Sequence, residues 1–146
     1  MANGPSVQTA DPSLRDLLCL SMVSGVGPNL FRALVERLGS PTTVLDASMS
    51  RLRDVPGIGV KLAERIAAAR RENKVEQELA DCERLGVRIL TADSNQFPAS
   101  LGSIPDPPAV LYVRGDLLPR DTLAVAMVGS RHCTHYGLRT AERLAG

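Results

Sequence analysis

The 146-residue chain has no tryptophan, two tyrosines and two phenylalanines, so aromatic side chains make up only 3% of it. Proteins that bind single-stranded nucleic acids on a broad base-stacking surface use many aromatic side chains. The composition therefore argues against a surface of that kind. Any contact with a nucleic acid is expected to be made to its backbone.

Cysteine is also scarce, and it follows no recognisable pattern. Cys19, Cys82 and Cys133 are odd in number, lie far apart and form no Cys-x-x-Cys pair. Neither a disulfide framework nor a zinc knuckle is indicated, and we expect reduced thiols. His132 and His135 flank Cys133, but no fourth ligand follows at a recognisable spacing, so we predict no metal site.

Long hydrophobic runs are absent as well. No stretch approaches the roughly 20 apolar residues of a membrane span. The segment Met1–Ser13 has neither the basic nor the apolar region of a secretion signal. With 44% hydrophobic residues the chain is expected to be globular, cytoplasmic and not associated with a membrane.

The net charge of +1 conceals an uneven distribution. Residues 1–74 carry ten Lys and Arg against seven Asp and Glu, whereas residues 75–146 carry seven against nine. A local basic face of this kind can bind a polyanion. The alternative is an ordinary solvent-exposed helix face, which has the same composition. The basic excess lies at Arg51, Arg53, Lys61, Arg65, Arg70, Arg71 and Lys74.

The first part of the chain is predicted to be helical. Residues 1–12 are small and polar and are expected to form a flexible tail, after which Ser13 is placed to cap a helix. Pro28 suits the first turn of the next helix, and Gly39 its end. Together with shorter helices near 42–47, 60–71 and 74–85, these predict a helical domain over residues 13–85.

Two segments of this domain repeat one pattern. VSGVGPNLFRALVERLG and VPGIGVKLAERIAAAR share a glycine, an apolar residue and a glycine, with first glycines at 25 and 57. Such a turn lets the backbone approach a ligand and leaves the next helix's N–H groups free for a phosphate. These features are typical of the helix-hairpin-helix motif, in which Val26 and Ile58 would pack inward. The sequence predicts a SAM-like tandem of two hairpins.

The second hairpin is the expected DNA contact. The first offers only Arg32 and Arg37 as cations, and whether its Gly25 and Gly27 touch DNA is left open. A purely structural alternative is that both turns are tight helix connections. In the second hairpin we expect two glycines and two cations to contact phosphates, Gly57, Gly59, Lys61 and Arg65.

After Gly86 the pattern changes to strands. Segments 87–91, 109–113 and 123–128 are strand candidates, and the third is almost wholly apolar, as in a central parallel strand. A parallel strand needs a crossover and a partner, so residues 86–146 are expected to be the incomplete start of a parallel-sheet domain. The overall class expected is α+β or α/β.

A second phosphate site is expected after the third strand candidate. Open α/β sheets place ligands beyond the carboxyl ends of their strands. Gly129 permits a tight turn, Ser130 and Thr134 offer hydroxyls, and Arg131 offers a forked pair of donors. The alternative is that Arg131 pairs with a carboxylate. The spacing is not Gly-x-Gly-x-x-Gly, so we expect no dinucleotide and no other cofactor.

From about residue 14 to residue 146 the chain resembles the DprA (Smf) family of DNA-processing proteins, which also fits its helical first part, and the specific motifs lie in the second half. VRILTADSNQFPASLGSIPDPPAVLYVRG, residues 87–115, is similar to the family's pattern around D-x-P-x-x-L-Y-x-x-G, although Phe97 stands where the family more often has Tyr. VGSRHCTHYGLRTAERLA, ending at Ala145, is similar to the family's V-G-S-R-x-x-T-x-Y-G loop and helix.

The resemblance implies a Rossmann-like second domain and a protein without catalytic activity. It implies binding and protection of single-stranded DNA, assistance in loading a RecA-type recombinase during natural transformation, and a homodimer for the full-length protein. Two alternatives stay open. One is a nucleotide hydrolase similar to the lysine-decarboxylase-like phosphoribohydrolases, and the other is a helical protein-interaction module.

Overall fold

The computed structural model describes residues 11–72, 74–119 and 123–146. Most of the expected tail, residues 1–10, lies outside the described residues. The last two residues of the expected tail, Asp11 and Pro12, are the N-cap and the first residue of the first helix. Pro12 is the first helical residue, and the Asp11 carboxylate accepts a hydrogen bond from the Ser13 amide at 2.8 Å. The expected cap at Ser13 is therefore wrong, because Asp11 can satisfy a free amide two residues ahead while proline needs no N–H there.

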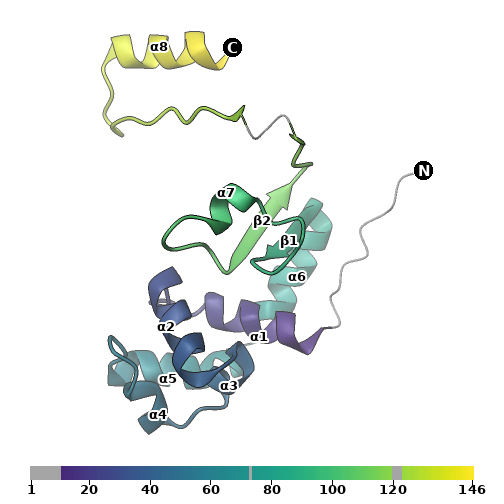
Figure 1. Ribbon diagram of the computed structural model, residues 1–146, viewed down its shortest axis with the longest axis vertical. Coiled ribbons are helices and arrows are strands. Elements are labelled where there is room, and N and C mark those ends of the chain that lie inside the picture. The colour runs from purple at the N-terminus through teal and green to yellow at the C-terminus, as the bar shows by residue number, and fades with distance from the viewer. Residues whose placement is uncertain (1–10, 73, 120–122) are drawn as a thin grey trace, which may run out of the picture. The chain divides into compact units, whose positions relative to one another are not determined.

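Helices come first along the chain; the two strands of a sheet follow, with one short helix between them and another helix after them (Figure 1). The chain divides into two compact units, Met1–Gly115 and Asp116–Gly146. The expected division into a helical domain that ends at residue 85 and a second domain that begins at residue 86 remains a prediction. The elements are α1 (Pro12–Ser21), α2 (Pro28–Leu38), α3 (Pro41–Leu45), α4 (Met49–Arg53), α5 (Val60–Ala68), the 3₁₀ helix η1 (Ala69–Glu72), α6 (Lys74–Leu85), β1 (Val87–Thr91), α7 (Ala99–Gly102), β2 (Val110–Arg114) and α8 (His135–Ala145).

One hydrophobic core joins the helices of the first unit. Its members come from α1 through α5 and from both glycine turns, and no buried polar or charged side chain is found among the described residues. Burial of such aliphatic side chains is the main driving force of folding. The largest fully buried side chains are Leu18, Leu20, Leu34, Leu52, Ile66, Val44 and Val55.

The two glycine turns have the same geometry. In each, the first glycine has a positive φ, +99° at Gly25 and +89° at Gly57, a conformation that favours glycine. In each, the amide of the apolar residue between the glycines donates to the carbonyl three residues before it. These bonds are Val26 N to Val23 O at 2.9 Å and Ile58 N to Val55 O at 3.1 Å. The inward packing expected of Val26 and Ile58 is confirmed, since both are buried.

The two hairpins also pack against each other reciprocally. A Cβ built on Gly25 would lie 3.3 Å from Leu62 Cδ1, and one built on Gly57 would lie 3.0 Å from Leu30 Cδ2. Leu30 and Leu62 occupy the same position in the repeat, three residues after its second glycine. The helical tandem is therefore a pair of equivalent hairpins in contact.

A polar tie stabilises the other side of the helical bundle. From η1, Arg70 Nε and Nη2 donate to the two carboxylate oxygens of Asp16 in α1 at 3.0 and 2.8 Å, and Nη1 donates to Asp46 at the end of α3. Burial raises the pKa of the Asp16 carboxyl, but hydrogen bonds from Arg70 and Thr42 and the charge of Arg70 outweigh it. The pKa of Asp16 is consequently lowered.

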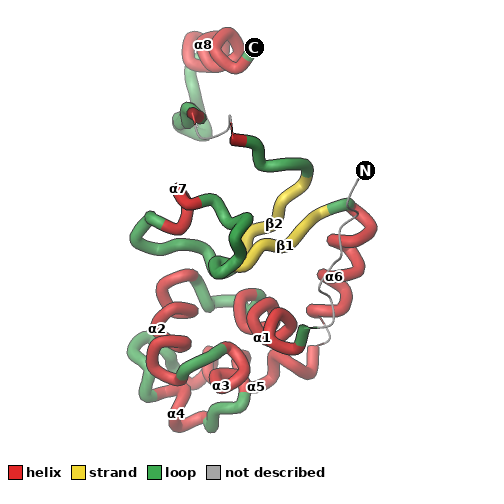
Figure 2. Tube along the Cα trace, turned by 45° about the vertical axis from the view of Figure 1, so that its right-hand side comes forward, coloured by secondary structure: helices red, strands yellow, loops and turns green. Residues whose placement is uncertain are grey.

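The sheet consists of β1 and β2, which run antiparallel with Val87 opposite Arg114 and Thr91 opposite Val110. Figure 2 shows α6 beside these strands. The first two expected strands are confirmed, the second shifted by one residue. A parallel arrangement is not observed, because the connection through α7 turns the chain back on itself. Antiparallel strands need no crossover helix.

The expected third strand, Leu123–Val128, is not a strand in this structure. Leu123, Val125 and Val128 are 90%, 88% and 94% exposed. A central strand forms only when neighbouring strands satisfy its backbone groups, and within the described ranges none lies beside it. The parallel, Rossmann-like part of the expected fold is therefore not observed here. No described helix is long and apolar enough to cross a membrane.

Candidate nucleic-acid interface

The second hairpin presents a run of free backbone donors. Gly59, with φ −85° and ψ 173°, is the N-cap of α5 and has no side chain to accept from the helix amides. The Gly59 carbonyl accepts from Leu62 and Ala63 at 3.1 and 3.0 Å. The amides of Gly59, Val60 and Lys61 have no acceptor among the described residues. Three successive N–H donors at a helix N-terminus favour the binding of an anion.

The two glycines of this hairpin have different environments. A Cβ built on Gly59 would meet nothing within 4 Å, so the backbone there is open to a ligand. Gly57 has a positive φ and lies against Leu30, which makes it part of the packing between hairpins. Of the two glycines expected to contact DNA, the structure therefore places Gly59 at the open surface and gives Gly57 a structural role.

The two expected cations also differ. Lys61 is exposed on the first turn of α5, and no described carboxylate pairs with it. Arg65, one turn later, donates from Nη1 to the Ser24 carbonyl of the first hairpin at 2.9 Å. That bond leaves the guanidinium charge unneutralised and fixes it between the two turns. Arg65 thus both joins the hairpins and keeps a positive charge near them.

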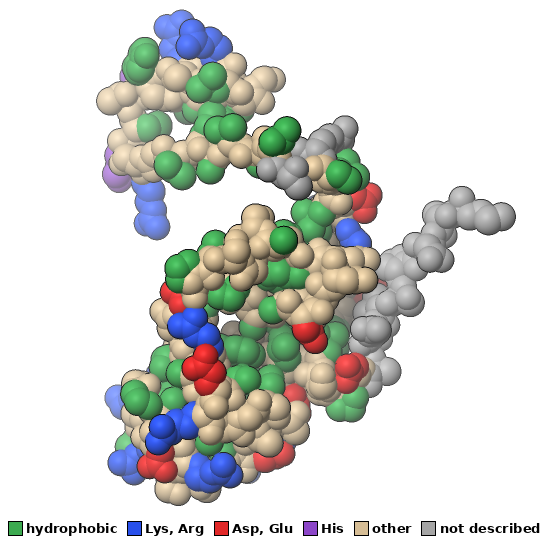
Figure 3. Space-filling view, in the orientation of Figure 1, with side chains coloured by type: hydrophobic (Ala, Val, Ile, Leu, Met, Phe, Trp, Pro, Cys, Tyr) green, Lys and Arg blue, Asp and Glu red, His purple; other side chains and the backbone are tan. Residues whose placement is uncertain are grey.

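The rest of the basic stretch divides into paired and unpaired side chains. Arg70 is neutralised by Asp16 and Asp46, and Lys74 pairs with Glu72. Figure 3 shows Lys and Arg side chains, interspersed with Asp and Glu, around the end of this unit where α4 and α5 lie. Within the basic stretch of residues 51–74, apart from the undescribed residue 73, the cations for which no ion pair is found are Arg51, Arg53, Lys61, Arg65 and Arg71.

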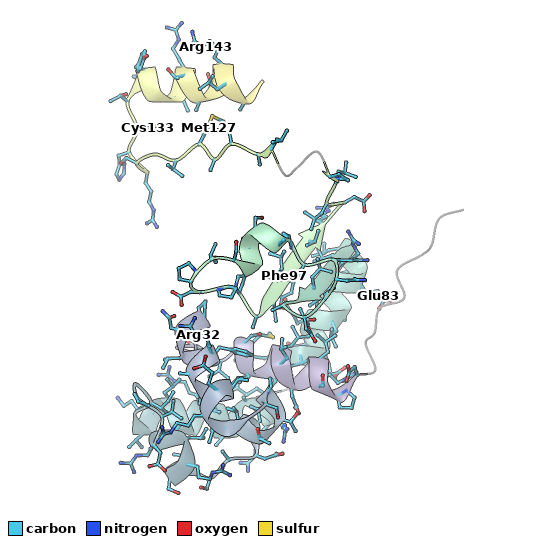
Figure 4. All side chains as sticks on the ribbon, viewed as in Figure 1. Arg32, Glu83, Phe97, Met127, Cys133 and Arg143 are labelled. Carbon is cyan, nitrogen blue, oxygen red and sulfur yellow. The ribbon has the colours of Figure 1, made fainter. Side chains whose placement is uncertain are left out.

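The first hairpin faces a carboxylate of the same chain. Arg32 in α2 donates from Nη1 to the Pro105 carbonyl at 2.6 Å, and its Nη2 lies 3.3 Å from Asp106 Oδ1. Figure 4 labels Arg32, on α2 near the loop that precedes β2. With its amide nitrogen turned toward Asp106, Asn29 donates to Asp106 Oδ2 at 3.2 Å. Sequence reasoning missed this contact, since no local pattern links residues so far apart.

The second expected phosphate site lies in the unit that contains α8. Thr134 caps α8 by accepting from the Gly137 amide at 3.2 Å, and the Ser130 hydroxyl accepts from the His132 amide at 3.2 Å. Gly129 and Arg131 are exposed, and no described carboxylate pairs with Arg131. Ser130 and Thr134 are thus each engaged with the neighbouring backbone, and Gly129, Ser130 and Arg131 lie in the loop that leads to Thr134. Within the described ranges no group of three His, Cys, Asp or Glu side chains could hold a metal ion.

Comparison with known families matches both parts of the chain. Residues 16–72 match the model of the SAM-like helix-hairpin-helix tandem. Residues 88–146 match the model of DNA recombination-mediator protein A. The predicted helix-hairpin-helix tandem is thereby confirmed. No solved structure matches the chain.

Two curated proteins are similar over most of the chain. Protein Smf of Synechocystis sp. is 32% identical over 132 residues, which cover 88% of this chain and 33% of that protein. DNA processing protein DprA of Bacillus subtilis is 32% identical over 123 residues, which cover 75% of this chain and 41% of that protein. The chain therefore spans about a third to two fifths of the length of these relatives.

Proposed function

Because the chain belongs to the DprA/Smf family of DNA-processing proteins, we propose that it binds single-stranded DNA through the phosphate backbone. The observation that carries this proposal is the second hairpin, where three free amides and the unpaired Lys61 occupy one helix start. In the cell the bound strand would be protected in the cytoplasm and delivered to a RecA-type recombinase. The role is binding, without catalysis and without a cofactor.

The chemistry of the hairpin favours phosphate and no particular base. Amides of Gly59, Val60 and Lys61 can donate to phosphate oxygens, and the Lys61 ammonium adds a charge-assisted contact. Such contacts fix the position of a strand and carry no base information. The scarcity of aromatic side chains agrees with a site that does not stack bases. Binding is therefore expected to be independent of sequence.

A second contact is proposed at the start of α8. Gly129, Ser130 and Arg131 lie in the loop that leads to Thr134, the N-cap of α8, and the exposed Arg131 could hold a phosphate with two parallel donors. We propose that Leu123–Val128 forms the central strand of a Rossmann-like sheet when further parallel strands pair with it, which would cover its exposed side chains. That sheet would place the four residues at a strand's carboxyl end, and a homodimer would present two such sites.

The test is the salt dependence of binding to a labelled oligothymidylate, measured by fluorescence anisotropy. If two to four phosphates are neutralised, log K should fall against log salt with a slope of roughly −1.4 to −2.8. Lys61→Ala should lower the affinity and flatten the slope by about 0.7. The matched control is Lys74→Ala, because Lys74 is also exposed but is already paired with Glu72.

Three results would count against the proposal. Equal affinities and salt slopes for Lys61→Ala and Lys74→Ala would exclude the second hairpin as the DNA contact. An affinity that ignores salt would exclude backbone contact altogether. Displacement of DNA by a free nucleoside monophosphate, with its hydrolysis, would favour the nucleotide hydrolase instead.

A further inference from the structure

The two hairpins share one backbone geometry, yet they differ at the residues that face outward. Where the second hairpin has Val60 and Lys61, the first has Pro28 and Asn29. Proline has no N–H, so the first helix start offers one donor fewer. Asparagine carries no charge, so it also lacks the cation. The first hairpin is therefore the weaker site for an external phosphate.

What the first hairpin does hold is an anion from its own chain. The Asp106 carboxylate lies 3.3 Å from Arg32 Nη2, and the neighbouring Pro105 carbonyl accepts from Arg32 Nη1 at 2.6 Å. With the Asn29 side-chain amide nitrogen turned toward Asp106, that nitrogen donates to Asp106 Oδ2 at 3.2 Å. In the second hairpin the residue equivalent to Arg32 is Glu64, which has no described ion-pair partner. The groups that bind Asp106 are thus specific to the first hairpin.

We propose that the first hairpin is a docking site for the protein's own Asp106 and is closed to DNA by it. Asp106 is the nearer of two carboxylates that pair with Arg32, the other being Glu36 at 3.8 Å. The Asp106 carboxylate would also repel a phosphate that approached Asn29. The same contact fastens the loop before β2 to α2. The first hairpin thereby binds the loop before β2, and the second hairpin stays accessible to DNA. This inference rests on the proposed function, and it assigns the two copies of the repeat different ligands of the same chemical class.

The experiment uses Asp106→Asn in the same anisotropy assay on the 146-residue chain. Removing the negative charge should leave Arg32 with only the longer, exposed pair to Glu36, in which Nε lies 3.8 Å from Oε1. Arg32 could then contact a phosphate through Nη1 and Nη2, and the affinity should rise roughly fivefold, which corresponds to about 1 kcal/mol. The salt slope should steepen by about 0.7, one additional phosphate. Arg32→Ala alone should leave the affinity unchanged, since Arg32 is already neutralised. In the double variant the gain should disappear.

A second measurement tests the docking contact without DNA. Asp106→Asn and Arg32→Ala should each speed hydrogen exchange at residues 103–109 and leave α5 unchanged. An unchanged affinity for Asp106→Asn, or a gain that persists in the double variant, would overturn closure by Asp106. Unchanged exchange at residues 103–109 would overturn docking. Lys61→Ala in parallel separates the two proposals, because only the proposed function requires it to weaken binding.

Discussion

Gly57 lies so close to Leu30 that a Cβ on Gly57 would stand 3.0 Å from Leu30 Cδ2. Two residues further on, Gly59 has open space on the corresponding side. The glycines of one hairpin thus serve different purposes. Gly57 allows the two hairpins to meet, and Gly59 leaves the backbone of α5 accessible.

Gly57→Ala is therefore expected to destabilise the fold, and Gly59→Ala to spare it. At residue 57 the methyl would combine an unfavourable positive φ, roughly 1–2 kcal/mol, with a clash against Leu30. At residue 59 φ is −85°, and the change of N-cap should cost no more than about 1 kcal/mol. Urea unfolding of both variants measures the difference, and equal losses of stability would contradict it. Gly59→Ala should nevertheless weaken DNA binding, because its methyl projects where a phosphate would approach.

Acid should weaken the tie between Asp16 and Arg70. The pKa of Asp16 is lowered in the folded state, so the ionised carboxylate stabilises the fold above its ordinary value of 3.8. This contribution is lost as the pH falls through the lowered pKa. At pH 7, Asp16→Asn should reduce the free energy of unfolding by about 1 to 2 kcal/mol. Between about pH 5 and pH 2 the free energy of unfolding of the Asp16→Asn variant should also decline less than that of the unsubstituted chain.

The control for this measurement is Asp81→Asn. Asp81 is exposed and pairs only with Arg84 one turn away in α6. Its stability should follow that of the unsubstituted chain across the same pH range. If Asp16→Asn showed the same acid dependence as Asp81→Asn, Asp16 would not be the group that titrates.

Arg131→Ala should weaken single-stranded DNA binding and leave the fold intact. The residue is exposed, and a charged hydrogen bond to phosphate is worth roughly 1.5 to 3 kcal/mol. Arg143→Ala is the matched control, since Arg143 is an exposed arginine in the last turn of α8 (Figure 4). Affinities measured by anisotropy, with circular dichroism to confirm folding, check this. Equal affinities for the two variants would remove Arg131 from the proposed site.

Local patterns predicted much of the helical tandem. The repeated Gly-x-Gly frame and the apolar period identified the hairpins, the inward Val26 and Ile58, and the end of α2 at Gly39. These features depend on neighbours within a few residues, which a single sequence displays directly. The strand over residues 87–91 was predictable for the same reason.

Features that depend on distant partners were not predictable. The apolar segment Leu123–Val128 reads as a buried strand, but its state depends on strands elsewhere that would pair with it. In the sequence Asp106 is recognisable only as one residue of a motif. Its partner Arg32 lies far earlier in the chain, in the helical domain. Arg65 reads as a phosphate ligand, and only the structure shows it bonded to the Ser24 carbonyl.

The reciprocal contacts of Gly25 with Leu62 and of Gly57 with Leu30 also bear on how the domain folds. Neither hairpin completes its own apolar surface, because each leucine is covered by the opposite turn. A single hairpin is thus a poor folding nucleus, and the transition state must bring together segments from both copies of the repeat. The helical tandem should consequently fold and unfold as one cooperative unit, and a cut between α3 and α4 should leave two pieces that fold only when mixed.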